Sequence, residues 1–89
     1  MAMTVMTPEW KHVADDIMIF VLRNRMQDET QFQSLAQSPR LLFNQWANSR
    51  GTAIQNAELA LWCVNYLRKL ADMPIARLKK AAEIDGLKY

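Results

Sequence analysis

The chain has 89 residues, 51% of them hydrophobic and 22% charged, and a formal net charge of +2 at pH 7. A chain of this length is too short for two domains. A folded domain of this size buries only about 60–65% of the surface that its unfolded chain exposes, so a single core is marginally stable. The one cysteine excludes an internal disulfide, and the longest apolar run, 17–22, is far too short to cross a bilayer. The first ten residues lack the pattern of a secretory signal, and we expect a protein of the reducing cytoplasm.

The first predicted helix covers residues 8–27 and follows a segment, 1–6, that we expect to be flexible. Thr7 supplies a capping hydroxyl, Pro8 suits a first helical turn, and Glu9 places a negative charge at the positive end of the helix. The apolar side chains form two arcs: a main arc of Trp10, Val13, Ala14, Ile17 and Val21, and a second arc of Met18, Ile19, Leu22 and Met26. A helix with two apolar sides is predicted to be enclosed by the bundle or shared with another chain.

Two shorter helices are predicted next. Asp28 is placed to cap a helix over roughly 29–37, and Ser38 before a proline indicates the start of another over roughly 39–49. Gly51 is suited to end this third helix in the left-handed conformation. The inward-facing residues of the two helices are predicted to be Phe32, Leu35 or Ala36, Leu42, Phe43 and Trp46.

Residues 52–73 contain no Gly or Pro and are apolar on most of their helical circumference, which predicts the central, buried helix of a bundle. The predicted core stripe is Ile54, Ala57, Leu61, Val64, Leu67 and Leu70 or Ala71, widened by Leu59, Cys63, Tyr66 and Met73. The remaining polar strip is Glu58, Asn65, Lys69 and Asp72, interrupted by Trp62. We therefore expect Ile17, Trp46, Leu61 and Val64 to be buried.

Pro74 interrupts the chain because the residue before a proline is disfavoured in the helical region. A last helix over roughly 74–84, ended by Gly86 and followed by a tail over 87–89, is predicted to turn Ile75, Leu78, Ala82 and Ala81 inward. No segment has the alternation of a strand. The predicted fold is all-α: a single-domain bundle of four to five helices around the central helix 52–73.

Few residues offer chemistry. His12, Asp15 and Asp16 share one helix face, but a stable metal site needs about four ligands, and a solvated polar stripe is the stronger interpretation. Cys63 has apolar helix neighbours that would not lower the pKa of its thiol, which favours a buried, inert cysteine. The chain has no glycine-rich phosphate loop. We expect neither an enzyme nor a bound cofactor or metal.

The apolar content exceeds what one small bundle can bury, and this favours an interaction module that forms a homodimer. The candidate protein interface consists of Met18, Ile19, Leu22, Met26 and Trp62. The competing interpretation is that the helix over 29–37 folds back and covers the second apolar arc within one chain. A regulator, adaptor, inhibitor or immunity-type protein would each fit this description.

The charge distribution suggests an alternative function, nucleic-acid binding. The first 67 residues hold five cations and six acids, whereas the rest hold six cations and three acids. The candidate contacts are Arg68, Lys69, Arg77, Lys79 and Lys80. The same cations have structural explanations, because the dipole of the central helix favours cations in its last turn and the last helix faces solvent. The helix lengths also do not suit a helix-turn-helix motif. Protein binding is therefore the leading hypothesis.

Overall fold

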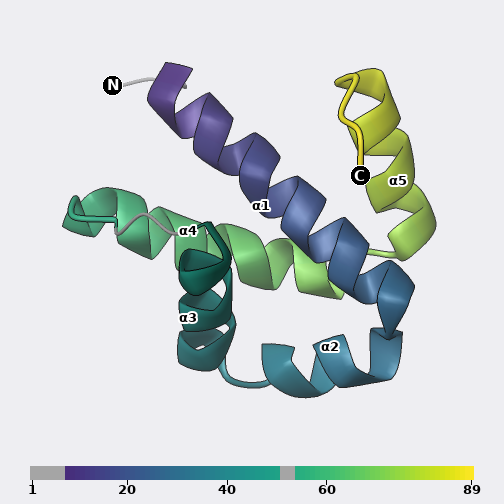
Figure 1. Cartoon of the computed structure of the whole chain (residues 1–89), viewed down its shortest axis with the longest axis horizontal. Coiled ribbons are helices and arrows are strands. Elements are labelled where there is room, and N and C mark those ends of the chain that lie inside the picture. The colour runs from purple at the N-terminus through teal and green to yellow at the C-terminus, as the bar shows by residue number, and fades with distance from the viewer. Residues whose placement is uncertain (1–7, 51–53) are drawn as a thin grey trace.

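The computed structural model describes residues 8–50 and 54–89, and every regular element within these ranges is a helix (Figure 1). The helices are α1 (Pro8–Gln27), α2 (Glu29–Ala36), α3 (Pro39–Arg50), α4 (Ala57–Asp72) and α5 (Ile75–Ile84). The predicted all-α bundle is confirmed, with five helices. The predictions made for the segment 1–6, for Thr7 and for Gly51 lie outside the described residues.

The crossing of α1 and α4 forms the centre of the bundle (Figure 1). Helix α1 packs against α2, α4 and α5, while α3 packs against α4 and α2. The buried side chains form one continuous core that draws on all five helices. None of the described helices is both long and apolar enough to span a membrane.

Short-range capping explains the starts of α2 and α3. The Asp28 side chain accepts a hydrogen bond from the backbone N–H of Gln31 at 3.0 Å, and the Ser38 hydroxyl accepts one from Leu41 at 3.4 Å. These bonds satisfy N–H groups that the first turn of a helix leaves free. The predicted starts of both helices are confirmed.

Helix α5 ends as Gly86 predicts. Gly86 has a φ of 71°, a left-handed conformation that costs glycine little. Its N–H donates a hydrogen bond to the carbonyl of Glu83 at 3.0 Å, and the N–H of Leu87 donates one to the carbonyl of Ala82 at 2.9 Å. This pair of bonds is the Schellman arrangement, which satisfies carbonyls at the end of a helix.

The start of the central helix differs from the prediction. Ile54, Gln55 and Asn56 precede α4 instead of forming its first turn. Asn56 has an extended backbone, and its side-chain oxygen accepts a hydrogen bond from the N–H of Leu59 at 3.1 Å. An asparagine that caps in this way begins a helix after itself, which explains the later start.

The buried face of α4 also differs from the prediction. The core-facing residues are Leu59, Cys63, Leu67, Leu70 and Ala71. Leu61 is 64% exposed and Val64 is half-buried, so the predicted burial of these two was wrong, whereas Ile17 and Trp46 are fully buried as predicted. A nearly all-apolar helix contains two plausible stripes, and only the positions of α1 and α3 select between them.

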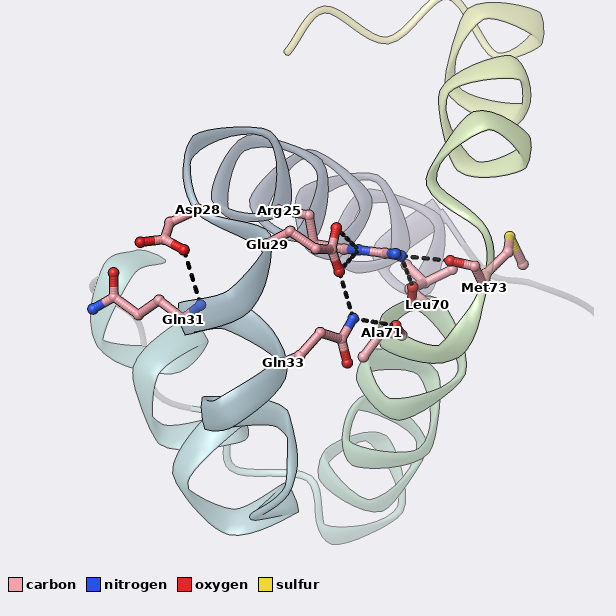
Figure 2. A network of polar contacts seen from close by, with 8 residues as sticks. All are labelled: Arg25, Asp28, Glu29, Gln31, Gln33, Leu70, Ala71 and Met73. Carbon is pink, nitrogen blue, oxygen red and sulfur yellow. Dashed lines mark hydrogen bonds and ion pairs between the residues drawn. The ribbon is translucent and has the colours of Figure 1, made fainter.

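Arg25 is a buried arginine that joins three helices (Figure 2). Its Nη1 donates to the backbone carbonyls of Leu70 at 2.8 Å and Met73 at 2.6 Å, at the C-terminal end of α4. Its Nε donates to the carboxylate of Glu29, the first residue of α2. This hydrogen bond is the main reason why the pKa of Glu29 is lowered. Arg25 thus caps α4 with a cation from α1, where the helix dipole favours positive charge.

Gln33 extends the same network (Figure 2). Its side-chain amide donates to the Ala71 carbonyl at 2.8 Å and to the Glu29 carboxylate at 2.7 Å. The end of α1, α2 and the end of α4 are therefore held together by polar bonds. We interpret this network as structural, because its donors and acceptors satisfy one another.

Candidate functional site

A groove runs between α1 and α3 and consists of three adjoining recesses. The central recess has a volume of about 350 Å³ and is lined by Asp16, Ile19, Phe20, Arg23, Asn24, Gln45, Ser49 and Arg50. It shares Arg50 with a recess of about 460 Å³ next to the start of α4. It shares Asn24 and Gln45 with a recess of about 400 Å³ next to α2. Together they form an elongated site with mixed polar and apolar walls.

Helical spacing explains why these side chains meet. Asp16, Phe20 and Arg23 recur at intervals of three and four along α1, and so they lie on one side of that helix. On α3, Gln45 and Ser49 are one turn apart, and Arg50 occupies the last turn, where the helix dipole favours a cation. The site therefore depends on two helices that are separated in the sequence by α2.

Trp46 anchors the two walls to each other. Its ring is fully buried, and its indole Nε1 donates a hydrogen bond of 2.8 Å to the Asp16 carboxylate across the groove. Phe43 packs against the ring at a centroid distance of 5.8 Å, and the Ser49 hydroxyl donates to the Trp46 carbonyl. The Asp16 carboxylate is consequently engaged within the protein.

Within residues 8–50 and 54–89, no carboxylate forms an ion pair with either arginine of the central recess. The Arg50 guanidinium lies over the Trp46 ring, with its central carbon 5.2 Å from the ring centroid. Its Nη1 is shielded from solvent and has no hydrogen-bond acceptor among the described residues. Arg23 is exposed, and no described carboxylate lies within ion-pairing distance of it. Among the described residues, the recess thus brings together two guanidinium groups that form no ion pair, and of the two Arg23 is the exposed one.

The predicted protein interface is divided by the structure. Met18 and Leu22 are buried in the core, because α2 and α5 both pack on α1. Ile19 is half-buried in the wall of the groove, and Met26 is 51% exposed. The continuous surface strip that the helical spacing predicted is therefore absent from α1, whose side chains are described throughout from Glu9 onward.

Trp62 belongs to an aromatic cluster between α1 and α4. Its ring stacks on Tyr66 at a centroid distance of 4.8 Å and contacts Trp10 at 5.5 Å. Burial raises the pKa of Tyr66, in keeping with its position beneath the indole. Trp62 is half-buried rather than fully exposed, so part of its apolar surface is used within the chain.

The five candidate nucleic-acid contacts do not share one face. Arg77 and Lys80 are exposed and one turn apart on α5, whereas Lys79 is half-buried on another side of that helix. On α4, Arg68 borders a small recess facing α2, and Lys69 lies about 100° further around the helix. These five cations are close in the sequence, but their different faces make it difficult for all of them to contact one phosphate backbone at the same time.

The side chains His12, Asp15 and Asp16 do not converge. Asp15 pairs with Lys11 at 2.6 Å, Asp16 accepts the indole N–H described above, and His12 is exposed beside the groove. No group of three potential metal ligands is found in the described part of the chain.

Cys63 is fully buried in the core of α4, as predicted. Burial raises the pKa of its thiol from the ordinary 9.0 to about 11, a shift that the nearby Arg50 partly opposes. The thiol is thus held in its protonated form at neutral pH, which makes a nucleophilic role unfavourable.

Because the pKa of the Cys63 thiol is raised in the folded chain, we expect the unfolding free energy to fall in alkali. The unfolded chain ionises Cys63 near pH 9.0 and the folded chain near pH 11, so the contribution is present below pH 9.0 and lost as the pH rises towards 11. Urea unfolding should show that wild type loses more unfolding free energy over this interval than Cys63→Ala, by up to ~1.4 kcal/mol per pH unit. Parallel pH profiles for the two proteins would contradict the assignment.

Arg23 and Arg50 are the site residues that the sequence interpretation missed. The count of charges along the chain pointed to the C-terminal third, where cations outnumber acids. The groove instead combines one cation from α1 with one from α3, and both belong to the part of the chain where acids outnumber cations. Periodicity places Arg23 on the polar side of α1, but no local signal indicates that Arg50 faces it.

The comparisons with known proteins reveal no matching family model, no similar curated protein and no similar solved structure.

Proposed function

We propose that the chain is a small, non-enzymatic helical interaction module that binds another protein through the groove between α1 and α3. The observation that carries the proposal is the central recess, which is lined by both Arg23 and Arg50 and where neither arginine forms an ion pair with a described carboxylate. A charged group that is partly shielded from water gains from an external partner, because desolvation is otherwise uncompensated. Regulators, adaptors, inhibitors and immunity-type proteins are the classes to which such a module belongs.

The groove has further properties that suit a protein ligand. The apolar side chains of Ile19 and Phe20 line the recess beside the amides of Asn24 and Gln45. Apolar contact supplies affinity, and amides that can both donate and accept hydrogen bonds supply orientation. The linear succession of three recesses suits an extended segment better than a compact small molecule.

The proposal is tested by affinity capture from the native host with three forms of the chain. We expect wild type to retain a specific protein, Arg23→Gln/Arg50→Gln to lose it, and Arg40→Gln, an exposed arginine that lines none of the three recesses, to retain it. Circular dichroism establishes that the double variant is folded. A captured protein that is retained equally by all three forms would contradict a role for the groove.

Homodimer formation remains a separate proposal, now supported by fewer residues. With Met18 and Leu22 in the core, the apolar side chains of the second arc that still reach the surface are Ile19 and Met26. Light scattering at micromolar concentration decides the matter, since a monomer mass rejects the dimer. If a dimer forms, Ile19→Glu/Met26→Glu should yield folded monomers, whereas a persistent dimer would place the interface elsewhere, with Trp62 the next candidate.

Nucleic-acid binding through Arg68, Lys69, Arg77, Lys79 and Lys80 is the alternative function. Its support is the excess of cations in the C-terminal third of the chain. If it is correct, replacing Arg77, Lys79 and Lys80 together with alanine should weaken binding and flatten its salt dependence. Absence of binding by wild type at low salt would reject this function.

A further inference from the structure

We propose that two copies of the chain exchange their last helices, so that α5 of each copy leaves its own α1 and packs on α1 of the other. The exchange rests on the homodimer proposed above and gives it a defined interface, and it is independent of the groove between α1 and α3. Three features of the fold support it: the packing of α5, the strip of α1 that α5 covers, and the hinge between α4 and α5.

Helix α5 packs mainly on α1, and Figure 1 shows it on the opposite side of α1 from α3. A contact at each end shows that the two helices run antiparallel. Just before α5, the Met73 carbonyl accepts a hydrogen bond of 2.6 Å from Arg25. Just after α5, the Asp85 carboxylate lies 3.8 Å from the Lys11 ammonium. The position of α5 therefore depends mainly on one helix, which lies far from it in the sequence.

The strip of α1 beneath α5 is apolar between these two end contacts. Positions 11, 15, 18, 22 and 25 recur at intervals of three and four, so they lie on one side of α1. Met18 and Leu22 are buried there, and Leu78 and Ala82 are the fully buried residues of α5. Met26 continues the strip one turn beyond Leu22 and is 51% exposed. The apolar strip is therefore longer than α5 covers.

Neither α5 nor its strip is stable alone in water. Helix α5 has 10 residues, fewer than the about 12–15 that an isolated helix needs, and no side chain of the described residues caps its start. Its release would expose Met18, Leu22 and Leu78 together. A second copy offers the same strip, so an exchanged helix regains the contacts that it lost. The hinge and the protein concentration then decide between the single chain and the dimer.

The hinge consists of Met73 and Pro74, the two residues that join α4 to α5. Both have an extended backbone, with ψ angles of 140° and 135°. The end of α4 does not depend on α5, because Arg25 of α1 binds the carbonyls of Leu70 and Met73. Rotation about ψ of Pro74 therefore redirects α5 and leaves the other four helices in place.

Met26 offers the dimer a contact that the single chain lacks. It follows Arg25, whose guanidinium reaches the hinge, and so it lies at the end of the strip nearest the hinge. Two chains that exchange α5 about a twofold axis bring their hinges close to that axis. Each copy can then cover Met26 of the other, and burial of this apolar side chain favours association.

Cross-linking of the full chain tests the exchange directly. Lys11→Cys/Asp85→Cys, in a Cys63→Ala background, places two thiols at positions that face each other across the contact between α1 and α5. Monomer and dimer are separated by size and treated with a short bismaleimide. We expect cross-links within one chain in the monomer fraction, and covalent dimers on a denaturing gel in the dimer fraction. Lys11→Cys/Glu83→Cys is the matched control and should form few of either, because Glu83 is exposed ~200° around α5 from Asp85.

Variants of the hinge provide a second measurement that keeps the whole contact between α1 and α5. Pro74→Ala lets α4 and α5 join into one helix that leads away from its own α1, and we expect the dissociation constant of the dimer to fall by ~10-fold or more. Pro39→Ala makes the same change at the start of α3 and should leave this constant within ~2-fold of wild type. Three Gly-Ser residues inserted after Pro74 should raise it, because a longer linker folds back more easily. Light scattering from micromolar to millimolar concentration measures all four proteins.

The possible failures are distinguishable. A monomer mass of wild type over the whole concentration range would overturn the exchange and the homodimer together, and it would leave protein binding by the groove unaffected. A dimer fraction that is cross-linked only within single chains would overturn the exchange, while the homodimer would stand. A dissociation constant that is unchanged or raised in Pro74→Ala, or lowered equally in Pro39→Ala, would also overturn the exchange.

Discussion

Replacing Leu67 with alanine is expected to lower the unfolding free energy by about 2–5 kcal/mol. Leu67 is fully buried at the middle of α4, where the core side chains of the bundle meet. Truncation removes apolar contacts and leaves a cavity that a close-packed interior can only partly refill. Urea or thermal unfolding followed by circular dichroism measures the loss, which is large for a domain of this size because total stability is only about 5–15 kcal/mol.

Leu61→Ala is the matched control for this experiment. It makes the same chemical change on the same helix, but Leu61 is 64% exposed. Its effect should stay within ~0.5 kcal/mol, as is usual for surface substitutions. If Leu61→Ala were the costlier of the two, α4 would have the rotation that its sequence pattern first suggested.

Replacing Arg25 with methionine is expected to destabilise the fold by about 3 kcal/mol. The variant keeps a long side chain but removes the donors for the carbonyls of Leu70 and Met73, the first of which is buried. Hydrogen bonds from charged groups contribute about 1.5–3 kcal/mol each, and an acceptor left buried without a donor adds to the loss. Because these bonds hold the end of α4, hydrogen exchange should increase most at the end of α4 and in α5.

Glu29→Gln distinguishes capping of α4 from simple ion pairing. Glu29 bonds to the same arginine, but its side chain is 44% exposed and regains water when the charge is removed. The expected loss is below ~1 kcal/mol, the usual range for a partly exposed ion pair. Equal losses for the two variants would show that the bond from α1 to α2, and not the cap on α4, is what Arg25 contributes.

A fold of four to five helices and most of the helix ends could be predicted because they depend on neighbours in the sequence. Asp28 and Ser38 bond to backbone groups three residues ahead, and Gly86 adopts a conformation that other residues avoid. Such interactions form within a single turn and need no knowledge of the rest of the fold. The same local principle explains the error at Asn56, whose equally local cap the prediction overlooked.

The faces of the helices were decided by tertiary structure. On α4, Leu61 and Leu67 both lie in apolar stripes, and packing on α1 and α3 buries only the second. On α1, Met18 and Leu22 formed a plausible surface for a second chain until other helices of the same chain covered them. Periodicity identifies which residues share a side, but it does not identify what that side will face.

The candidate site could not be predicted for the same reason. Arg23 is far from Arg50 in the sequence, and only the path of the chain through α2 brings their helices to opposite walls of one groove. Arg25 likewise looks like another surface cation until α4 supplies the carbonyls that bind it. Helix capping depends on residues within one helical turn, so a short stretch of sequence is enough to predict it. Burial and long-range polar contacts depend on how all five helices pack.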